Sequence, residues 1–120
     1  MKSRKEILDI INNSHGSEAY HKFSPIPEFP VATDGAVALA SAAGCFWLLD
    51  IIGSYQGDKR LDPEFQVWEL EVDCENCSGV IRGYNNTKLI ITQEIPWTDF
   101  PLDGVKLYLI DGIILLPSEH

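Results

Sequence analysis

The feature that most constrains the fold is an apolar stretch at residues 34–55, whose first fifteen residues after Asp34 carry no charged side chain. More than half of these fifteen are alanine or leucine, which are strong helix formers. Thr33 or Asp34 can accept the free backbone N–H groups of a first helical turn. Gly53 or Gly57 can end the helix in the left-handed conformation. The stretch therefore predicts one long helix.

Apolar side chains occur on two nearly opposite faces of this predicted helix. Trp47 and Ile51 belong to one face, and Leu39 and Phe46 belong to the other. A helix that is apolar most of the way round is a buried one. The uncharged run is shorter than the roughly 20 residues that span a bilayer, and Asp50 interrupts it. We therefore expect a core helix and no membrane anchor.

Length and composition predict a single domain over residues 1–120. Nine Lys and Arg against eighteen Asp and Glu give a formal net charge of −9. Because Lys and Arg dominate the binding of phosphate backbones, this balance argues against a nucleic-acid partner. Three cysteines, an odd number, and the lack of a continuous apolar segment after the first five residues argue against a secreted disulfide framework. We expect a cytoplasmic protein.

Two further features precede the strands. Ser3 and Glu6 have the spacing of a capping box and predict a short helix that ends near Asn13. Three prolines alternate with apolar residues in the segment 17–32, which predicts an extended loop over the core with a single helical turn near residues 17–21.

The second half of the chain predicts a sheet. Alternating apolar and polar residues predict strands at 65–73, 80–84, 88–95, 105–110 and 113–116. Asn85 and Asn86 tolerate the positive φ angles of a two-residue turn, and Asp111-Gly112 is the strongest short hairpin signal. The element order predicts an α+β fold of two layers. In it, two N-terminal helices pack on one face of a mostly antiparallel meander of about five strands.

The alternation also assigns side chains to the two faces of this sheet. Trp68, Leu70 and Val72 share the face toward the helix. In the last hairpin the inner face carries Val105, Leu107, Leu109, Ile114 and Leu116. The opposite face carries Tyr108, Ile110, Ile113 and Leu115, which is too apolar for a free surface. We expect this face to be covered by the proline loop or by a second copy of the chain.

Acidic residues line the outward face of the first predicted strand. Glu69, Glu71 and Asp73 are spaced roughly 6–7 Å apart, since successive same-side residues are two rises apart. The segment 58–75 contains seven acidic and two basic residues. Such a face can dock a basic partner or loosely bind a divalent cation. It can equally be a solvated face that discourages pairing between sheet edges.

Cys74-Glu75-Asn76-Cys77 has the spacing of a zinc knuckle or a redox pair. Tetrahedral zinc requires four ligands, and the remaining candidates are Cys45, His15, His21 and His120. Thioredoxin-type chemistry places this motif at a helix N-terminus, whereas here it separates two strands. We interpret it as a hairpin turn, with metal binding and a redox or disulfide role as alternatives.

Three other positions are candidates for a site. Asp50 in apolar surroundings would have a raised pKa, as catalytic acids often do, unless it points to solvent. Cys45 is either a nucleophile beside a histidine or a buried small hydrophobe. The loop 96–104 places Trp97, Asp99 and Phe100 close to two prolines. It either displays a rigid aromatic anchor for an interface or plugs the open end of the two layers.

Five sequence blocks resemble an uncharacterised family of small bacterial, phage and plasmid proteins. The blocks are Thr33-Asp34-Gly35, Trp47-Leu48-Leu49-Asp50, Phe65-Gln66-Val67-Trp68, Thr98-Asp99-Phe100-Pro101-Leu102 and Leu115-Leu116-Pro117-Ser118-Glu119. The resemblance covers most of the chain from about Tyr20 onward. It implies a single compact domain and a link to mobile elements, and it implies no activity.

These observations favour a small acidic protein that binds another protein, as a homodimer through the face of Tyr108, Ile113 and Leu115. No cofactor is expected. The alternative is a small enzyme or metal-dependent module that uses Asp50, the cysteines or the acidic strand face.

Overall fold

The fold is that of a computed structural model, which describes residues 3–13, 20–24 and 29–120. These residues form three α-helices, seven strands and two short 3-10 helices. The α-helices are α1 (Arg4–Asn13), α2 (Asp34–Ala43) and α3 (Phe46–Ser54). The strands are β1 (Tyr20–Lys22), β2 (Val31–Thr33), β3 (Gln66–Asp73), β4 (Ser78–Asn85), β5 (Lys88–Ile95), β6 (Gly104–Ile110) and β7 (Ile113–Leu115). The 3-10 helices are η1 (Tyr55–Gly57) and η2 (Pro117–Glu119).

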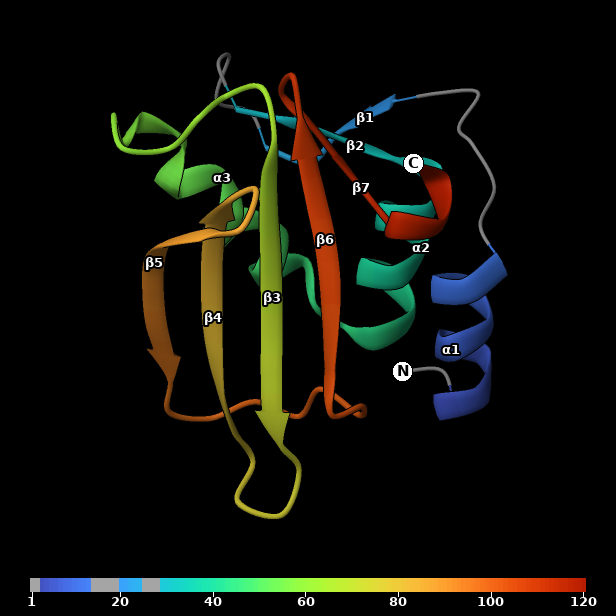
Figure 1. The fold of residues 1–120 in the computed structure, drawn as a ribbon. Coiled ribbons are helices and arrows are strands. Elements are labelled where there is room, and N and C mark those ends of the chain that lie inside the picture. Colours follow the sequence, from blue (N-terminus) through green and yellow to red (C-terminus); the bar gives the residue numbers. More distant parts are fainter. Residues whose placement is uncertain (1–2, 14–19, 25–28) are drawn as a thin grey trace.

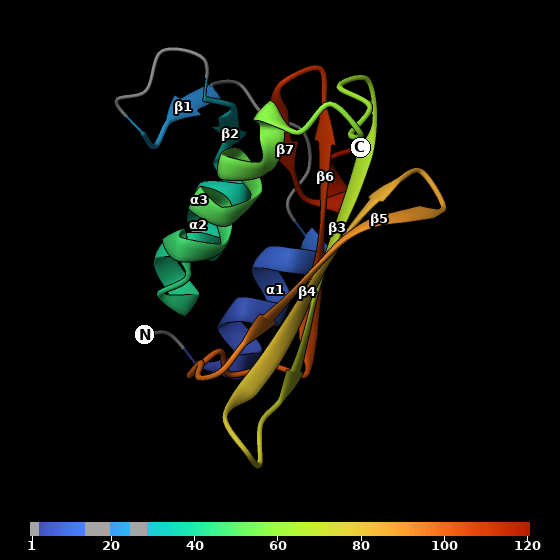
Figure 2. The same ribbon diagram turned by 90° about the vertical axis from the view of Figure 1, so that its left-hand side faces the viewer.

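The elements form two layers (Figures 1 and 2). Helices α2 and α3 lie on one face of the sheet, with α1 beside α2. The strand order is β1-β2-β7-β6-β3-β4-β5, in which β2 and β7 are parallel and the other neighbours are antiparallel. The predicted α+β class and the largely antiparallel sheet are confirmed. The predicted numbers of helices and strands are too low.

The predicted long helix is in fact two helices. Gly44 adopts the left-handed conformation, with φ 64° and ψ 37°, and ends α2. The backbone N–H of Cys45 then donates to the Ala40 carbonyl at 2.9 Å, and this hydrogen bond caps the C-terminus of α2 before α3 begins. Among the described glycines only Gly44 and Gly112 have positive φ, so neither glycine predicted to end the helix does so in this way. The predicted start is confirmed, because Thr33 Oγ1 accepts from the Ala36 N–H at 3.3 Å.

Part of the predicted proline loop consists of strands. Val31 and Ala32 of β2 pair in parallel with Ile113 and Ile114 of β7, and β1 pairs with the other edge of β2. Tyr20 and His21 belong to β1, so the predicted helical turn is wrong there, while residues 17–19 and 25–28 lie outside the described residues. Strands of three residues are too short to show an alternating pattern in the sequence. β2 forms because its backbone can hydrogen-bond to the edge of β7.

The strands do not form a simple meander. The loop 96–103 carries the chain from β5 past the ends of β4 and β3, so that β6 pairs with β3 (Figure 1). Trp68 and Leu107 are partners in this pairing. The predicted sequential order is therefore wrong after β5. Because β3 pairs with both β4 and β6, it is an inner strand of the sheet. Its side chains therefore pack against those of two neighbouring strands instead of one.

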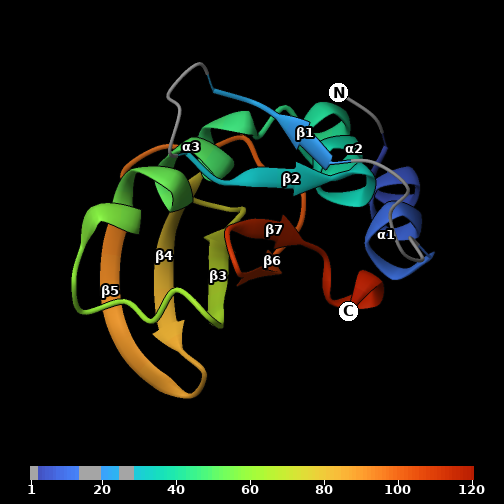
Figure 3. The ribbon, with the colours of Figure 1, turned by 90° about the horizontal axis from the view of Figure 1, so that it is seen from above.

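The core lies between the helices and the inner face of the sheet (Figure 3). The predicted inward residues Trp68, Leu70 and Val72 are all buried. From the last two strands and the segment after them, the core also receives the predicted residues Leu107, Leu109, Ile114 and Leu116. Leu39, Leu48 and Ile52 are among the buried helix residues that meet them. Apolar burial of this extent, at roughly 25 cal/mol per Å², drives the two layers together.

Candidate functional site

The candidate site is the outer face of the sheet, which is turned away from the helices and toward the viewer in Figure 1. Strand register brings its central side chains together. Val67 pairs with Tyr108, Tyr108 pairs with Leu115, and Ile110 pairs with Ile113. Directly paired residues project on the same side of a sheet. The predicted cluster of Tyr108, Ile113 and Leu115 therefore lies on one surface.

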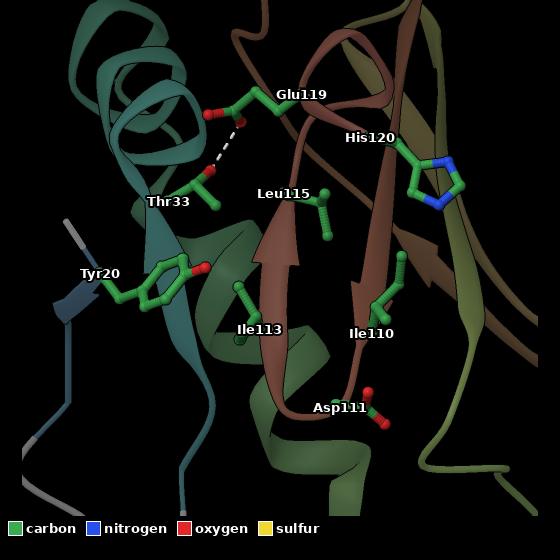
Figure 4. A pocket seen from close by; sticks show the side chains of 8 residues that line it. All are labelled: Tyr20, Thr33, Ile110, Asp111, Ile113, Leu115, Glu119 and His120. Atoms are coloured by element: carbon green, nitrogen blue, oxygen red, sulfur yellow. Dashed lines mark hydrogen bonds between the residues drawn. The ribbon is translucent and has the colours of Figure 1, made fainter. Parts of the chain in front are cut away.

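An apolar hollow of about 300 Å³ opens on this face, and we call it the β7 hollow (Figure 4). Ile110, Ile113 and Leu115 form its floor, with Tyr20 and His120 on opposite sides. Thr33, Asp111 and Glu119 complete the lining. Of the described part of the predicted proline loop, Tyr20 borders the hollow, whereas the ring of Phe29 packs against Gly53 of α3. His120 borders the hollow on the other side.

Three rings form a ridge beside the β7 hollow. The centroids of Phe65 and Tyr108 are 5.4 Å apart at an interplanar angle of 76°, and those of Tyr108 and His120 are 5.5 Å apart at 85°. Phe65 and His120 are nearly parallel, at 14° and 6.2 Å. Edge-to-face pairs of this kind are favourable beyond their buried area. We call these three residues the aromatic ridge.

A second hollow of about 510 Å³, the β3 hollow, lies on the other side of the ridge. It shares Phe65 and Tyr108 with the ridge, and its remaining lining residues are Val67, Glu69, Tyr84, Asn86, Thr87 and Lys106. The outer face thus presents a hollow, a ridge and a second hollow in succession. The β7 hollow is mainly apolar, whereas the β3 hollow is more polar.

Glu119 fixes the end of the chain beside the β7 hollow. Its Oε1 accepts from Thr33 Oγ1 at 2.6 Å and from the Leu116 N–H at 3.0 Å, and its Oε2 accepts from the Gly35 N–H at 3.2 Å. A carboxylate at this position also complements the positive end of the α2 dipole. The contact joins the first and last of the five sequence blocks and fixes the position of the segment that ends in His120 of the ridge. Sequence analysis missed Glu119 and Gly35 as partners.

The predicted acidic face contains paired carboxylates. Arg82 Nη1 donates to Glu71 Oε2 at 2.9 Å, and Lys106 Nζ lies 3.7 Å from Glu69 Oε1. Asp73 accepts from the Asn76 side chain and from the Glu75 and Asn76 backbone N–H groups, and the Asn76 bonds lower the pKa of Asp73. Much of the negative charge of this strand is therefore neutralised or used in the β3–β4 turn.

The loop 96–103 has a buried part and an exposed part. Phe100 is only 3% exposed and Thr98 only 4%, so these side chains plug the core. Trp97 is 67% exposed, and Asp99 is also exposed. Trp97 and Asp99 line a separate groove between this loop and α3. The structure therefore separates Phe100 from the other two predicted interaction residues.

The cysteines and Asp50 do not form a common site. Cys74 and Cys77 are exposed in the β3–β4 turn, and the Cys74 Sγ is directed at the Leu102 carbonyl at 3.5 Å. Partial desolvation of the sulfur raises the pKa of Cys74, and Asp103 raises it further, which is opposite to thiolate activation. Asp50 is exposed on α3. Across residues 3–13, 20–24 and 29–120, no group of three or more His, Cys, Asp or Glu residues is arranged to hold a metal ion.

Of the three histidines, His15 lies outside the described residues. His21 Nε2 is hydrogen-bonded to Asp34 Oδ1. His120 belongs to the aromatic ridge on the outer face, whereas Cys45 is buried at the start of α3 in the helix layer. A histidine beside Cys45, which the nucleophile interpretation of this cysteine needs, is therefore not found among the described residues.

Cys45 should be chemically inert in the folded protein. Its side chain is 1% exposed, and burial together with the nearby Asp99 charge raises its pKa to about 12. Because the thiolate is the reactive form, we expect an aromatic disulfide reagent at pH 8 to modify two thiols per native chain and three in denaturant. Intact-mass measurement with peptide mapping identifies the protected residue. Rapid native modification of Cys45 would contradict this burial.

In the described parts of the chain, no helix combines the length and the apolarity that crossing a membrane requires.

Comparison with curated proteins and with solved structures found no match. The sequence profile of a family of unknown function, DUF6876, matches residues 5–120, which include all five of the blocks named above. The chain therefore belongs to this family of unknown function.

Proposed function

We propose that the chain is a protein-binding module that forms a homodimer through the outer face of its sheet. The observation that carries this proposal is the juxtaposition of the aromatic ridge and the apolar β7 hollow on one surface. Such apolar surface favours burial against a partner. Tyrosine and other aromatic side chains are also enriched at the centres of protein interfaces.

Two-fold symmetry suits this surface. In a two-fold dimer the same patch contacts itself, so each protruding part must find a recess on the same patch of its partner. The ridge of Phe65, Tyr108 and His120 adjoins the hollow above Ile113 and Leu115. The ridge of each copy can therefore enter the β7 hollow of the other, so that the dimer contains this contact twice.

The charges favour a second copy over a basic partner. Two chains of net charge −9 repel each other, and the repulsion is smallest where the surfaces that meet carry little net charge. On the outer face, Glu71 is paired with Arg82 and Glu69 with Lys106. Because these pairs reduce the local negative charge, the outer face is suited to approach by another acidic chain. A strongly basic partner would gain little from carboxylates that are already paired.

The size of the molecule is sufficient for a stable dimer. Its accessible surface is 6708 Å², of which a typical stable interface takes ~800 Å² from each partner. The hollow and ridge occupy the β7, β6 and β3 part of the sheet, so a dimer through them buries the apolar centre and leaves the polar β3 hollow toward the rim. This is the usual organisation of a stable interface.

Ile113→Glu should abolish dimerisation at micromolar concentration. The substitution places a carboxylate on the floor of the β7 hollow, where it would be desolvated in the dimer, and we expect the dissociation constant to rise on the order of 100-fold. Size-exclusion chromatography with light scattering measures the mass of each variant. Circular dichroism establishes that the variant remains folded.

Leu8→Glu is the matched control, because Leu8 is an exposed leucine on α1, away from the outer face, and its substitution adds the same charge. This control should remain dimeric. The proposal would be wrong if the wild-type chain stayed monomeric up to about 1 mM. It would also be wrong if both variants dissociated equally.

We also infer the cellular compartment, the class of partner and the genetic context of this protein. The free thiols of Cys45, Cys74 and Cys77 and the odd cysteine count favour the cytoplasm, and the charge of −9 favours protein over nucleic acid as a partner. The resemblance that introduced the family implies phage or plasmid relatives. Sequencing the genes beside this one tests the link to mobile elements, because chromosomal housekeeping neighbours in several hosts would contradict it.

A further inference from the structure

A groove of about 450 Å³ lies on the helix side of the molecule, away from the proposed dimer face. Its lining residues are Gly44, Trp47, Ile51, Ile95, Trp97, Thr98 and Asp99, and we call it the tryptophan groove. Residues from α3, β5 and the loop 96–103 meet there. We propose that this groove binds an arginine side chain presented by a basic segment of a partner protein.

The loop that forms one wall of the groove is firmly held. The Thr98 N–H donates to the Cys77 carbonyl at 2.8 Å, and Thr98 Oγ1 accepts from the Phe100 N–H at 3.1 Å. Thr98 and Phe100 are buried while Trp97 and Asp99 are exposed, so burial alternates along the loop. Trp97 and Asp99 are thereby presented to solvent on a fixed backbone. A site that is ordered before binding loses little conformational entropy when a ligand arrives.

Trp97 is the most exposed of the large apolar side chains in the described residues, at 67%. It lies on the same groove as Trp47, which belongs to α3. Tryptophan faces attract cations through the ring quadrupole, and this attraction is strongest for tryptophan among the aromatic residues. A groove lined by an exposed indole and by a second indole is therefore suited to a flat cation rather than to an aliphatic side chain alone.

Asp99 supplies the charge that such a cation would pair with. In the part of the chain that the structure describes, no basic side chain lies within ion-pair distance of Asp99. Its charge also acts on Cys45, the neighbour of Gly44, because after burial it is the second cause of the raised pKa of that thiol. The carboxylate is thus available at the groove, in contrast to Glu69 and Glu71 on the outer face.

Arginine fits this combination better than lysine. Its planar guanidinium can stack on an indole while its N–H groups form two parallel hydrogen bonds with a carboxylate, whereas the lysine ammonium is a strongly hydrated point charge. The net charge of −9 increases the rate of encounter with a basic segment. A phosphate-bearing ligand is disfavoured, because Asp99 would repel it.

The test uses ¹⁵N-labelled full-length protein and the peptide acetyl-Gly-Ala-Arg-Ala-Gly-amide. The three indole N–H signals distinguish the sites, since Trp47 and Trp97 line the groove and Trp68 is buried in the core. We expect peptide-dependent shifts of the Trp47 and Trp97 signals at millimolar concentration and none of the Trp68 signal. The same peptide with citrulline in place of arginine has nearly the same shape without charge, and it should bind at least about tenfold more weakly.

Asp99→Asn should weaken binding of the arginine peptide about tenfold, and Trp97→Ala should remove it. Asp9→Asn is the matched control, because it removes one exposed carboxylate from α1, and it should leave binding unchanged. Three results would overturn the proposal: no indole shift at 10 mM peptide, equal binding of the citrulline peptide, or equal weakening by Asp9→Asn.

Binding in the tryptophan groove and dimerisation through the outer face are separable. Ile113→Glu should leave the peptide-induced shifts of Trp47 and Trp97 unchanged, and Trp97→Ala should leave the mass of the dimer unchanged. If Trp97→Ala instead dissociated the dimer, the groove would be occupied by a second copy of this chain, and the proposed basic partner would be wrong.

Discussion

Trp68→Ala will lower the free energy of unfolding by about 3–5 kcal/mol, the range for deleting a large aromatic side chain from a core. Trp68 is 1% exposed and belongs to β3, between β4 and β6. Its ring stacks on Tyr55 at a centroid distance of 5.8 Å, and it lies so close to Gly83 that a Cβ there would be 2.7 Å away. Its removal leaves a cavity that the surrounding strands cannot fill.

The substitution of Trp68 also removes a buried hydrogen bond. The indole Nε1–H donates to Gln66 Oε1 at 2.9 Å, and this buried amide also exchanges two hydrogen bonds with Gln56. Removing the indole takes one donor from a network in which every buried group is satisfied. Urea unfolding followed by circular dichroism measures the change, with an unaltered m value indicating that the two-state transition is retained.

Trp97→Ala provides the comparison within the same residue type. Because Trp97 is 67% exposed, its removal should change stability by no more than about 0.5 kcal/mol. A similar loss from both substitutions would mean that the two indoles are equally important to the core, and the packing described above would be wrong.

Gly104→Ala is expected to destabilise the protein by about 3 kcal/mol, at the upper end of typical overpacking costs. Gly104 begins β6 and pairs with Glu71 of β3. A Cβ at this position would lie 2.3 Å from the backbone oxygen of Leu70. Since Leu70 is in the middle of β3, its carbonyl cannot move without disturbing the pairing. The strand that carries Tyr108 to the outer face would then lose its register at one end.

Gly57→Ala is the control for this substitution. A Cβ at Gly57 would meet no atom within 4 Å, and the residue lacks a positive φ, so alanine should be neutral or stabilising by up to about 1 kcal/mol. Thermal unfolding of the two variants gives the contrast directly. Equal melting temperatures for the two variants would show that the close approach of β6 and β3 does not constrain Gly104.

Features that depend on neighbouring residues were predictable from sequence. The predicted N-cap of α1 is confirmed, because Ser3 Oγ accepts from the Glu6 N–H at 3.2 Å, and the same hydroxyl donates to Glu6 Oε1 at 3.1 Å. The Asp111–Gly112 turn is confirmed, since both residues have positive φ. The turn after β4 is displaced by one residue, to Asn86 and Thr87. In each case the controlling hydrogen bonds or φ angles lie within a few residues.

The candidate site was predictable only in part. Period-two alternation placed Tyr108, Ile113 and Leu115 on one face, because side-chain direction along a strand depends on the backbone alone. The same pattern could not show that Tyr20 and His120 would border the hollow on that face. It also could not reveal Gln66 as a fully buried polar residue, because its partners Gln56 and Trp68 meet it only after folding.

Local sequence thus specified the helix starts at Ser3 and Thr33, the Asp111–Gly112 turn and the inward or outward direction of the strand residues, since those choices involve contacts a few residues apart. Long-range packing settled the rest. Gly44 is compatible with a continuous helix or a break, and the packed structure takes the break between α2 and α3. The parallel pairing of β2 with β7 and the seat of Glu119 at Gly35, 84 residues away, join segments whose proximity exists only in the folded chain.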